Sequence, residues 1–311
     1  MDDRVCATEL YCGRAGYPEW LMHLADPPKV LYCLGDTGLL GKPGLAVIGA
    51  RRATPYGLTV ARRFAGWAAS QGVTIISGAA IGCDQAAQRA ALSSKGKTIA
   101  VLGCGCDVDY PYNARDLLAI LRRTHLVVSE APWGARPTRW SFRRRNRIIA
   151  ALASAVLVVE AGLGSGTFST ADHALELGRD VLSVPGSILS AESRGANRLI
   201  HQGATSIADI DELSHALAAA GLINDTSPLS DDPQPDLSRV ERAIAAAPAR
   251  PDDLARLLDM DVVSLCRRLS LLELDGRILR HTDGRYHIVA PDTHEPRYNA
   301  HGDTPGRQGA T

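Results

Sequence analysis

Arginine and aromatic residues are concentrated in one short stretch of this chain. Six arginines fall within the twelve positions 136–147, and three aromatic residues stand among or beside them. These residues are Arg136, Arg139, Arg143, Arg144, Arg145, Arg147, Trp133, Trp140 and Phe142. Guanidinium groups bind phosphate oxygens through two parallel hydrogen bonds, and flat aromatic rings stack on unpaired bases. The stretch is therefore typical of a single-stranded nucleic-acid site, although a charge run is equally typical of a solvated helix face.

Glycine-rich segments follow three of the apolar runs along the chain. Residues 49–52, 77–84 and 160–167 each begin where a short apolar run ends. In an open parallel sheet, ligands bind at the carboxyl ends of the strands, and backbone N–H groups at a helix N-terminus bind anions. Gly162, Gly164 and Gly166 form a candidate phosphate cradle, although glycines in one loop are equally typical of a tight turn. Several such loops on one sheet edge favour a ligand that carries phosphate.

The two standard nucleotide-binding fingerprints are absent from the sequence. No G-x-x-x-x-G-K-[ST] segment occurs, and the loop after residue 48 lacks G-x-G-x-x-G. The sequence therefore argues against a P-loop ATPase and against NAD or FAD binding, and we expect no cofactor. The seven cysteines are scattered without zinc-site spacing. We assign no metal, and we expect Cys104 and Cys106 to be buried as small apolar residues.

Composition places the chain among ordinary globular proteins. It has 311 residues, of which 45% are hydrophobic, and 34 basic residues balance 34 acidic ones, so the arginine cluster is a local feature. The N-terminus lacks the basic-then-apolar pattern of a secretory signal. The longest apolar stretch, residues 148–159, is too short to span a bilayer. We therefore expect a soluble, cytoplasmic protein with no membrane partner.

Short apolar runs alternate with amphipathic segments from residue 45 to about residue 213. The runs are rich in β-branched residues and bounded by Gly or Pro, which indicates strands buried on both faces. The expected strands are Leu45–Gly49, Val73–Ser77, Thr98–Leu102, Leu126–Ser129, Ala155–Glu160 and Val181–Val184. The expected helices include Leu58–Ser70, Gln85–Ser93, Arg115–Arg123 and Thr170–Leu177. This alternation predicts an α/β fold with a doubly wound, mostly parallel sheet.

The composition changes after residue 220. Residues 221–237 are rich in Pro and Asp, which predicts a linker. Three helical patterns (238–246, 251–258 and 262–275) and a hairpin around Asp283-Gly284 resemble a small winged-helix domain over residues 238–290. Residues 291–311 have the composition of a disordered tail. The predicted organisation is thus a sheet domain over residues 1–220, a linker, a winged-helix domain and a tail.

Five motifs in the sheet domain together resemble one known family. They are Val47-Ile48-Gly49-Ala50-Arg51, Ser77-Gly78-Ala79-Ala80-Ile81-Gly82-Cys83-Asp84, Phe142-Arg143-Arg144-Arg145-Asn146-Arg147, Val158-Val159-Glu160-Ala161 and Val184-Pro185-Gly186. Their order and spacing, from about residue 17 to residue 213, resemble the DNA-processing protein A (DprA, or Smf) family. The arginine-rich stretch falls on the F-x-x-R-N-R motif of that family. The combination is highly specific, although each motif alone is not.

The resemblance implies an extended Rossmann-like fold that binds single-stranded DNA without sequence preference and performs no reaction on it. The DNA-binding residues expected on that pattern are Gly49, Arg51, Arg52, Phe142, Arg143, Arg145, Asn146, Arg147, Gly164, Ser165 and Gly166. The phenyl ring is expected to stack on a base, the arginines to contact the backbone, and the glycine loop to supply phosphate-binding amides. Arg144 is expected to be a bystander, because the six arginines cannot all point the same way and some can pair with Glu130 or Glu160.

The resemblance also implies partners. Family members form homodimers that pass single-stranded DNA to the RecA recombinase and help it to displace single-strand-binding protein during natural transformation. Leu182, Ile188 and Leu189 are apolar candidates for the dimer contact. The sequence departs from the family pattern at Cys83, where isoleucine is usual, and at Arg143, where proline is frequent. Because only about forty residues precede the first expected strand, the helical N-terminal domain of many relatives is expected to be missing.

Two other functions compete with strand binding. The sheet also resembles phosphoribohydrolases that carry a P-G-G-x-G-T-x-x-E motif, but Thr170 stands in place of the catalytic glutamate, so glycosidic cleavage lacks an obvious general acid or base. Asp84, Glu130 and Glu160 remain as carboxylates near strand ends. The second alternative is a sequence-specific duplex reader. The winged-helix region has nine Arg against eight Asp or Glu, whereas duplex readers present a clearly basic face, so a protein contact is favoured there.

Overall fold

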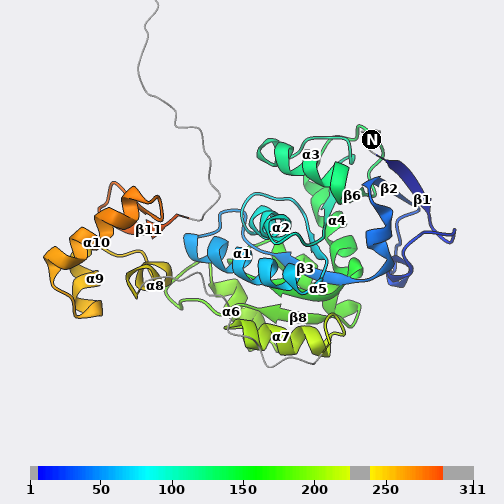
Figure 1. The fold of residues 1–311 in the computed structure, drawn as a ribbon. Coiled ribbons are helices and arrows are strands. Elements are labelled where there is room, and N and C mark those ends of the chain that lie inside the picture. Colours follow the sequence, from blue (N-terminus) through cyan, green and yellow to red (C-terminus); the bar gives the residue numbers. More distant parts are fainter. Residues whose placement is uncertain (1–5, 225–238, 290–311) are drawn as a thin grey trace, which may run out of the picture. The chain divides into compact units, whose positions relative to one another are not determined.

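The computed structural model describes residues 6–224 and 239–289. The chain divides into two compact units, residues 1–236 and 237–311, and each is described by itself. The larger unit is built on one nine-stranded sheet with helices on both faces (Figure 1). Its strands are β1 (Ala7–Tyr11), β2 (Val30–Gly35), β3 (Gly44–Ile48), β4 (Ile75–Ser77), β5 (Thr98–Leu102), β6 (Leu126–Ser129), β7 (Ala153–Val158), β8 (Asp180–Ser183) and β9 (Thr205–Ser206).

Seven α-helices and three short 3-10 helices connect the strands in the described part of this unit. The α-helices are α1 (Pro55–Ser70), α2 (Cys83–Ser93), α3 (Arg115–Thr124), α4 (Arg139–Leu152), α5 (Thr167–Glu176), α6 (Arg194–His201) and α7 (Ile210–Ala219). The 3-10 helices are η1 (Glu19–His23), η2 (Thr37–Gly41) and η3 (Tyr112–Ala114). Most strands are thus followed by a helix, which is the βαβ arrangement that the sequence predicted.

The strands lie in the order β1-β2-β6-β5-β4-β3-β7-β8-β9. Every neighbouring pair from β6 to β9 is parallel, whereas β1 and β2 add an antiparallel hairpin at one edge. The chain builds outward from β3 to β6 and then returns to form β7 on the other side of β3. The strand order therefore reverses between β3 and β7, and open sheets bind ligands at the carboxyl ends of the strands at such a reversal. The doubly wound, mostly parallel sheet is confirmed.

Strand β3 shows why the central strands have continuous apolar sequences. Leu45 and Val47 pack in a cluster with residues of α1, α2 and α7, while Ala46 and Ile48 pack in another with residues of α4 and α5. Successive side chains of a strand point to opposite faces of the sheet. Because helices cover both faces, every position of such a strand is buried, and the periodicity of two disappears from the sequence.

The elements that the sequence did not predict are β1, β2, β9, α6 and α7. Strand β1 lies at the sheet edge, and its exposed and buried positions are mixed, so it lacks the continuous apolar run that marked the central strands. Strand β9 has only two residues, both exposed. The strand expected to come first in the chain is therefore the third, β3.

The smaller unit is a winged helix. It contains α8 (Arg239–Ala246), α9 (Pro251–Leu258), α10 (Val262–Leu274) and the antiparallel hairpin of β10 (Ile278–Arg280) and β11 (Tyr286–Ile288). The expected winged-helix domain is confirmed. Most of the expected linker and all of the expected tail lie outside the described residues. Among residues 6–224 and 239–289, no helix is long and apolar enough to cross a membrane.

Candidate nucleic-acid interface

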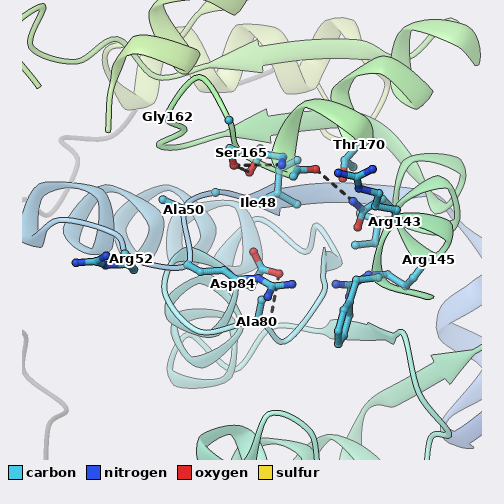
Figure 2. Close-up of a pocket in the computed structure, with 18 of the residues that line it drawn as sticks. Ile48, Ala50, Arg52, Ala80, Asp84, Arg143, Arg145, Gly162, Ser165 and Thr170 are labelled. Carbon is cyan, nitrogen blue, oxygen red and sulfur yellow. Dashed lines mark hydrogen bonds between the residues drawn. The ribbon is translucent and has the colours of Figure 1, made fainter. Parts of the chain in front are cut away.

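A pocket of about 770 Å³ lies beside the carboxyl ends of β3 and β7, where the strand order reverses (Figure 2). Its walls come from the loops after β3, β4, β7 and β8 and from the first three turns of α4. The lining residues are Ile48, Gly49, Ala50, Arg51, Arg52, Ala80, Asp84, Arg139, Phe142, Arg143, Arg145, Asn146, Ile149, Gly162, Gly164, Ser165, Gly166, Thr167, Thr170, Ala191 and Glu192. Segments more than a hundred residues apart in the chain thus share one cavity.

Ten of the eleven sequence-predicted DNA-binding residues line this pocket. They are Gly49, Arg51, Arg52, Phe142, Arg143, Arg145, Asn146, Gly164, Ser165 and Gly166. Figure 2 shows Arg143 and Arg145 on one side of the pocket and Arg52 on the other, with Gly162 and Ser165 of the glycine loop above Ala50 and Ile48. The eleventh residue, Arg147, does not line the pocket and is described below.

The loop after β3 carries two exposed arginines, Arg51 and Arg52, and is anchored at its far end. The backbone N–H and the side-chain hydroxyl of Thr54 each donate a 2.8 Å hydrogen bond to the buried carboxylate of Glu160, two residues after β7. A carboxylate at a helix N-terminus is also stabilised by the helix dipole of α1. A side chain at Gly57 would overlap this carboxylate, so a glycine is needed there. Glu160 therefore fixes the loop that presents the two arginines.

The glycine loop after β7 leads into the N-terminus of α5. Thr167 is the first residue of the helix, and its backbone N–H donates a 3.2 Å hydrogen bond to the Ser165 hydroxyl. The side-chain amide of Asn146 donates to the Gly166 carbonyl at 3.3 Å and to the Ser169 hydroxyl at 2.7 Å. Asn146 therefore holds the loop against α4, and its expected contact with DNA stays a prediction.

Arg145 forms the buried side of the pocket. Its guanidinium donates a hydrogen bond to the Val101 carbonyl, and it packs so closely on Gly78 that a side chain there would overlap it. Burial lowers the pKa of the Arg145 guanidinium to about 10, and the nearby Asp84 carboxylate opposes this shift. The group therefore remains positively charged at neutral pH. Its buried Nε has no hydrogen-bond partner within the described residues, so the protein does not fully satisfy this arginine.

Asp84 is the buried carboxylate beside Arg145. It accepts hydrogen bonds from the backbone N–H groups of Gly78 at 3.0 Å and Ala80 at 3.4 Å. Burial raises the pKa of the Asp84 carboxyl, and the charge of Arg145 opposes that rise. Asp84 thus shapes the loop after β4.

Cys83, one of the departures from the family pattern, is buried directly behind Gly49. A side chain on this glycine would come within 2.6 Å of the Cys83 sulfur.

Phe142 is half-buried at the rim of the pocket and has two ring neighbours. The ring of Tyr110 stacks on it with centroids 5.4 Å apart and an angle of 28° between planes, and Arg51 Cζ lies 5.2 Å from the Phe142 centroid. The arginine from the β3 loop and the aromatic ring from α4 therefore form one cation–π pair.

Arg147 lies on the face of α4 next to the pocket-lining one, and the expected contact of this residue with DNA is not supported. Its guanidinium is buried and forms a 2.8 Å ion pair with Glu130 and a longer one, 3.8 Å, with Asp26. Arg144 forms 2.9 Å ion pairs with the same two carboxylates, so the expected pairing of an arginine of this run with Glu130 is confirmed, and the bystander role of Arg144 stays a prediction. Four residues advance a helix about 40° beyond a full turn, and that rotation takes Arg147 away from the pocket-lining Arg143 and into reach of the two carboxylates.

Arg139 and Tyr110 are two residues at the site that the sequence-based list of DNA-binding residues did not include. Arg139 lines the pocket, and its membership of the arginine run was the signal that pointed to it. Tyr110 lies against Phe142 from a loop that follows β5, and only its position after an apolar run at the same sheet edge could have indicated it. The expected burial of Cys104 and Cys106 is confirmed, and burial raises the pKa of the Cys104 thiol to about 11.

The fold and the pocket define a class: a doubly wound α/β protein with an arginine- and glycine-lined pocket at the reversal of its sheet, followed by a winged helix. Residues 9–218 match the family model of DNA recombination-mediator protein A, and residues 224–284 match that of the DprA winged helix domain. The chain belongs to the DNA recombination-mediator protein A family.

Relatives and solved structures agree with this membership. A putative DNA processing protein DprA of Mycobacterium tuberculosis is 37% identical over 274 residues, which are 84% of this chain and 69% of the relative. DprA of Streptococcus pneumoniae superposes with a TM-score of 0.64 at 37% identity, over 67% of this chain and 74% of that one. DNA processing protein A of Helicobacter pylori, described for its unique single-stranded DNA binding mode, gives 0.63 at 34% identity, over 70% and 99%.

Proposed function

We propose that this protein binds single-stranded DNA without sequence preference and performs no reaction on the strand. The observation that carries the proposal is the convergence of five arginines and a glycine loop on one open pocket. The arginines are Arg51, Arg52, Arg139, Arg143 and Arg145. Guanidinium groups and backbone amides at a helix N-terminus are both phosphate ligands, and neither distinguishes one base from another. The single-stranded DNA binding of the Helicobacter pylori relative supports the same ligand.

A titration of fluorescent oligo-dT tests the proposal. We expect binding whose affinity falls linearly on a log–log plot as salt rises, because each neutralised phosphate releases counterions. Oligonucleotides of the other bases should bind comparably, and duplex of the same length should compete poorly. Preference for one base sequence, or duplex competition equal to that of a single strand, would contradict the proposal.

The absence of a reaction is part of the proposal. In the motif that resembles that of phosphoribohydrolases, the position of the catalytic glutamate is Thr170, which is buried in the pocket wall. Of the nearby carboxylates, Asp84 accepts two backbone hydrogen bonds and Glu160 holds Thr54. Incubation with nucleoside monophosphates should therefore release no free base, as chromatography of the products would reveal.

We also propose that the protein is a cytoplasmic homodimer that transfers the strand to RecA and helps it to displace single-strand-binding protein. Membership of the recombination-mediator family supports this assignment. Ile188 and Leu189 are 82% and 89% exposed and are available for a dimer contact, whereas Leu182 is buried in the sheet and is not. The tests are sedimentation equilibrium for the dimer and RecA ATPase activity on a strand coated with single-strand-binding protein, which should start sooner when this protein is present.

For the winged-helix unit we propose a contact with another protein rather than the reading of duplex sequence. Helix α10 exposes apolar side chains, with Val263 76% and Leu274 83% exposed, beside Arg267. A footprint at a defined duplex sequence would contradict this proposal.

A further inference from the structure

The ring of Phe142 is held on several sides. In addition to its contacts with Tyr110 and Arg51, it lies on the backbone of the loop after β5, because a side chain at Gly103 would come within 2.9 Å of its Cδ1 atom. A base that approaches Phe142 must therefore share it with, or displace, groups that are already packed there. Of the two stacked rings, Phe142 and Tyr110, it is therefore Tyr110 that offers a free face.

Tyr110 is 38% exposed. Buried tyrosines normally place their hydroxyl on a hydrogen-bond partner. In the part of the chain that the structure describes, the Tyr110 hydroxyl has no such partner, and its ring belongs to none of the buried apolar clusters. Stacking on Phe142 is the one ring contact of this side chain among the described residues, and it leaves ring surface open to solvent.

A small cleft joins Tyr110 to the main pocket. It has a volume of about 50 Å³ and shares Arg51, Ala80, Phe142 and Arg145 with the larger cavity. Tyr110 and Pro111 form part of its wall, together with small and apolar residues of the loops after β4 and β5. The cleft is too small to enclose a nucleobase, so a base near it lies across the exposed ring at its edge. Arg51 and Arg145 line both the cleft and the main pocket, so guanidinium groups lie next to this ring.

We propose that Tyr110 and Phe142 form an aromatic ledge on which one unpaired base of the bound strand stacks, with Tyr110 as the contacting ring and Phe142 as its support. The inference rests on the proposed function, since the ligand is the same single strand. Every base has a π-face, so such a ledge adds affinity without sequence preference. It also assigns the base contact to a residue outside the arginine-rich motif.

The experiment compares two ligands of equal length and charge, oligo-dT and a strand of abasic sugar-phosphate units, by anisotropy at constant salt. Tyr110→Leu keeps the bulk that supports Phe142 but removes the π-face, and Tyr110→Phe keeps the face. We expect Tyr110→Leu to bind oligo-dT about tenfold more weakly, which is the loss of one base stack. Its affinity for the abasic strand and its salt slope should be unchanged, and Tyr110→Phe should bind both strands as the unaltered protein does.

Tyr112→Leu is the matched control. Tyr112 is 77% exposed and lies two residues along the same segment, but it does not line either cavity. Equal losses in Tyr110→Leu and Tyr112→Leu, no loss in Tyr110→Leu, or an equal loss on dT and abasic strands would each overturn the ledge. The last of these would mean that Tyr110 merely supports Arg51. Failure of the unaltered protein to bind either strand would instead overturn the proposed function.

Discussion

Helix α4 carries two groups of arginines, one that lines the pocket and one that forms ion pairs within the protein. On the pocket side, Arg139 and Arg143 are exposed and line the cavity. On the other side, Arg144 and Arg147 share the carboxylate of Glu130 at 2.8 to 2.9 Å. The first pair keeps its charge available for a ligand, whereas the second neutralises acidic groups of its own chain.

This difference shows that an arginine run is not one functional unit. Both sides have the same residue type and the same helical backbone, so the neighbours decide the role of each residue. The pocket side faces glycine loops, and Arg139 and Arg143 form no ion pair there with the described residues. The other side faces Asp26 and Glu130, which bind them directly. We therefore expect a ligand that carries phosphate to contact the first pair and not the second.

The largest expected effect is that of Arg147→Met, which removes the buried charge and keeps the length of the side chain. Breaking a buried ion pair is costly, but Arg144 remains as a partner of Glu130, so we expect the free energy of unfolding to fall by about 2–3 kcal/mol. Urea unfolding measures this loss. Binding of oligo-dT by the folded protein should be unchanged. A weakened affinity for oligo-dT with unchanged stability would show instead that Arg147 contacts the strand.

For Arg51→Glu we expect the opposite result, a loss of strand affinity with no loss of stability. Loss of a charge-assisted contact to phosphate should weaken the binding of any single strand by about tenfold or more. The slope of log affinity against log salt should decrease in magnitude by about 1. Stability should not change, because Arg51 is exposed. Arg89→Glu, an exposed arginine of α2 outside the pocket, is the matched control for net charge, and an equal loss there would show that the effect is not local.

Gly78→Ala tests Arg145, which is both buried and part of the pocket. A Cβ at this position overlaps the guanidinium and must displace it from the Val101 carbonyl. We expect stability to fall by about 1 kcal/mol, the value of one hydrogen bond, together with a loss of strand affinity. Denaturation and anisotropy on the same sample measure both. Gly41→Ala, where a Cβ meets open space, should change neither, and loss of stability alone in Gly78→Ala would remove Arg145 from the DNA site.

The smallest effect is expected for Arg144→Ala. The side chain of Arg144 is 33% exposed, and partly exposed ion pairs contribute about 0.2–1 kcal/mol after solvent screening. Thermal unfolding should shift slightly downward, more so at low salt, and strand binding should not change. A clear loss of affinity would show that both sides of α4 reach the ligand and would remove the distinction between them.

Much of the architecture could be predicted from the sequence because its physical causes are local. The continuous apolar runs of β3 to β8 reflect burial by helices on both faces, and the turn glycines and prolines mark their ends. Edge elements such as β1 were missed because a strand at the sheet edge has a neighbour on one side only. Its exposed and buried positions are mixed, so the sequence shows no continuous apolar run there. Within the site, the arginine run and the glycine loop were visible as motifs, whereas the place of Tyr110 depends on a contact with Phe142, which lies 32 residues further along the chain.

Residue types and spacing by themselves determined that this protein has a glycine-rich sheet edge and an arginine-rich helix, because a strand buried on both faces and the glycines that end it depend on local residue types. Only the tertiary structure decided which arginines remain free for a ligand. That choice depends on carboxylates such as Asp26, which lies more than a hundred residues from α4 in the chain and meets it only after folding.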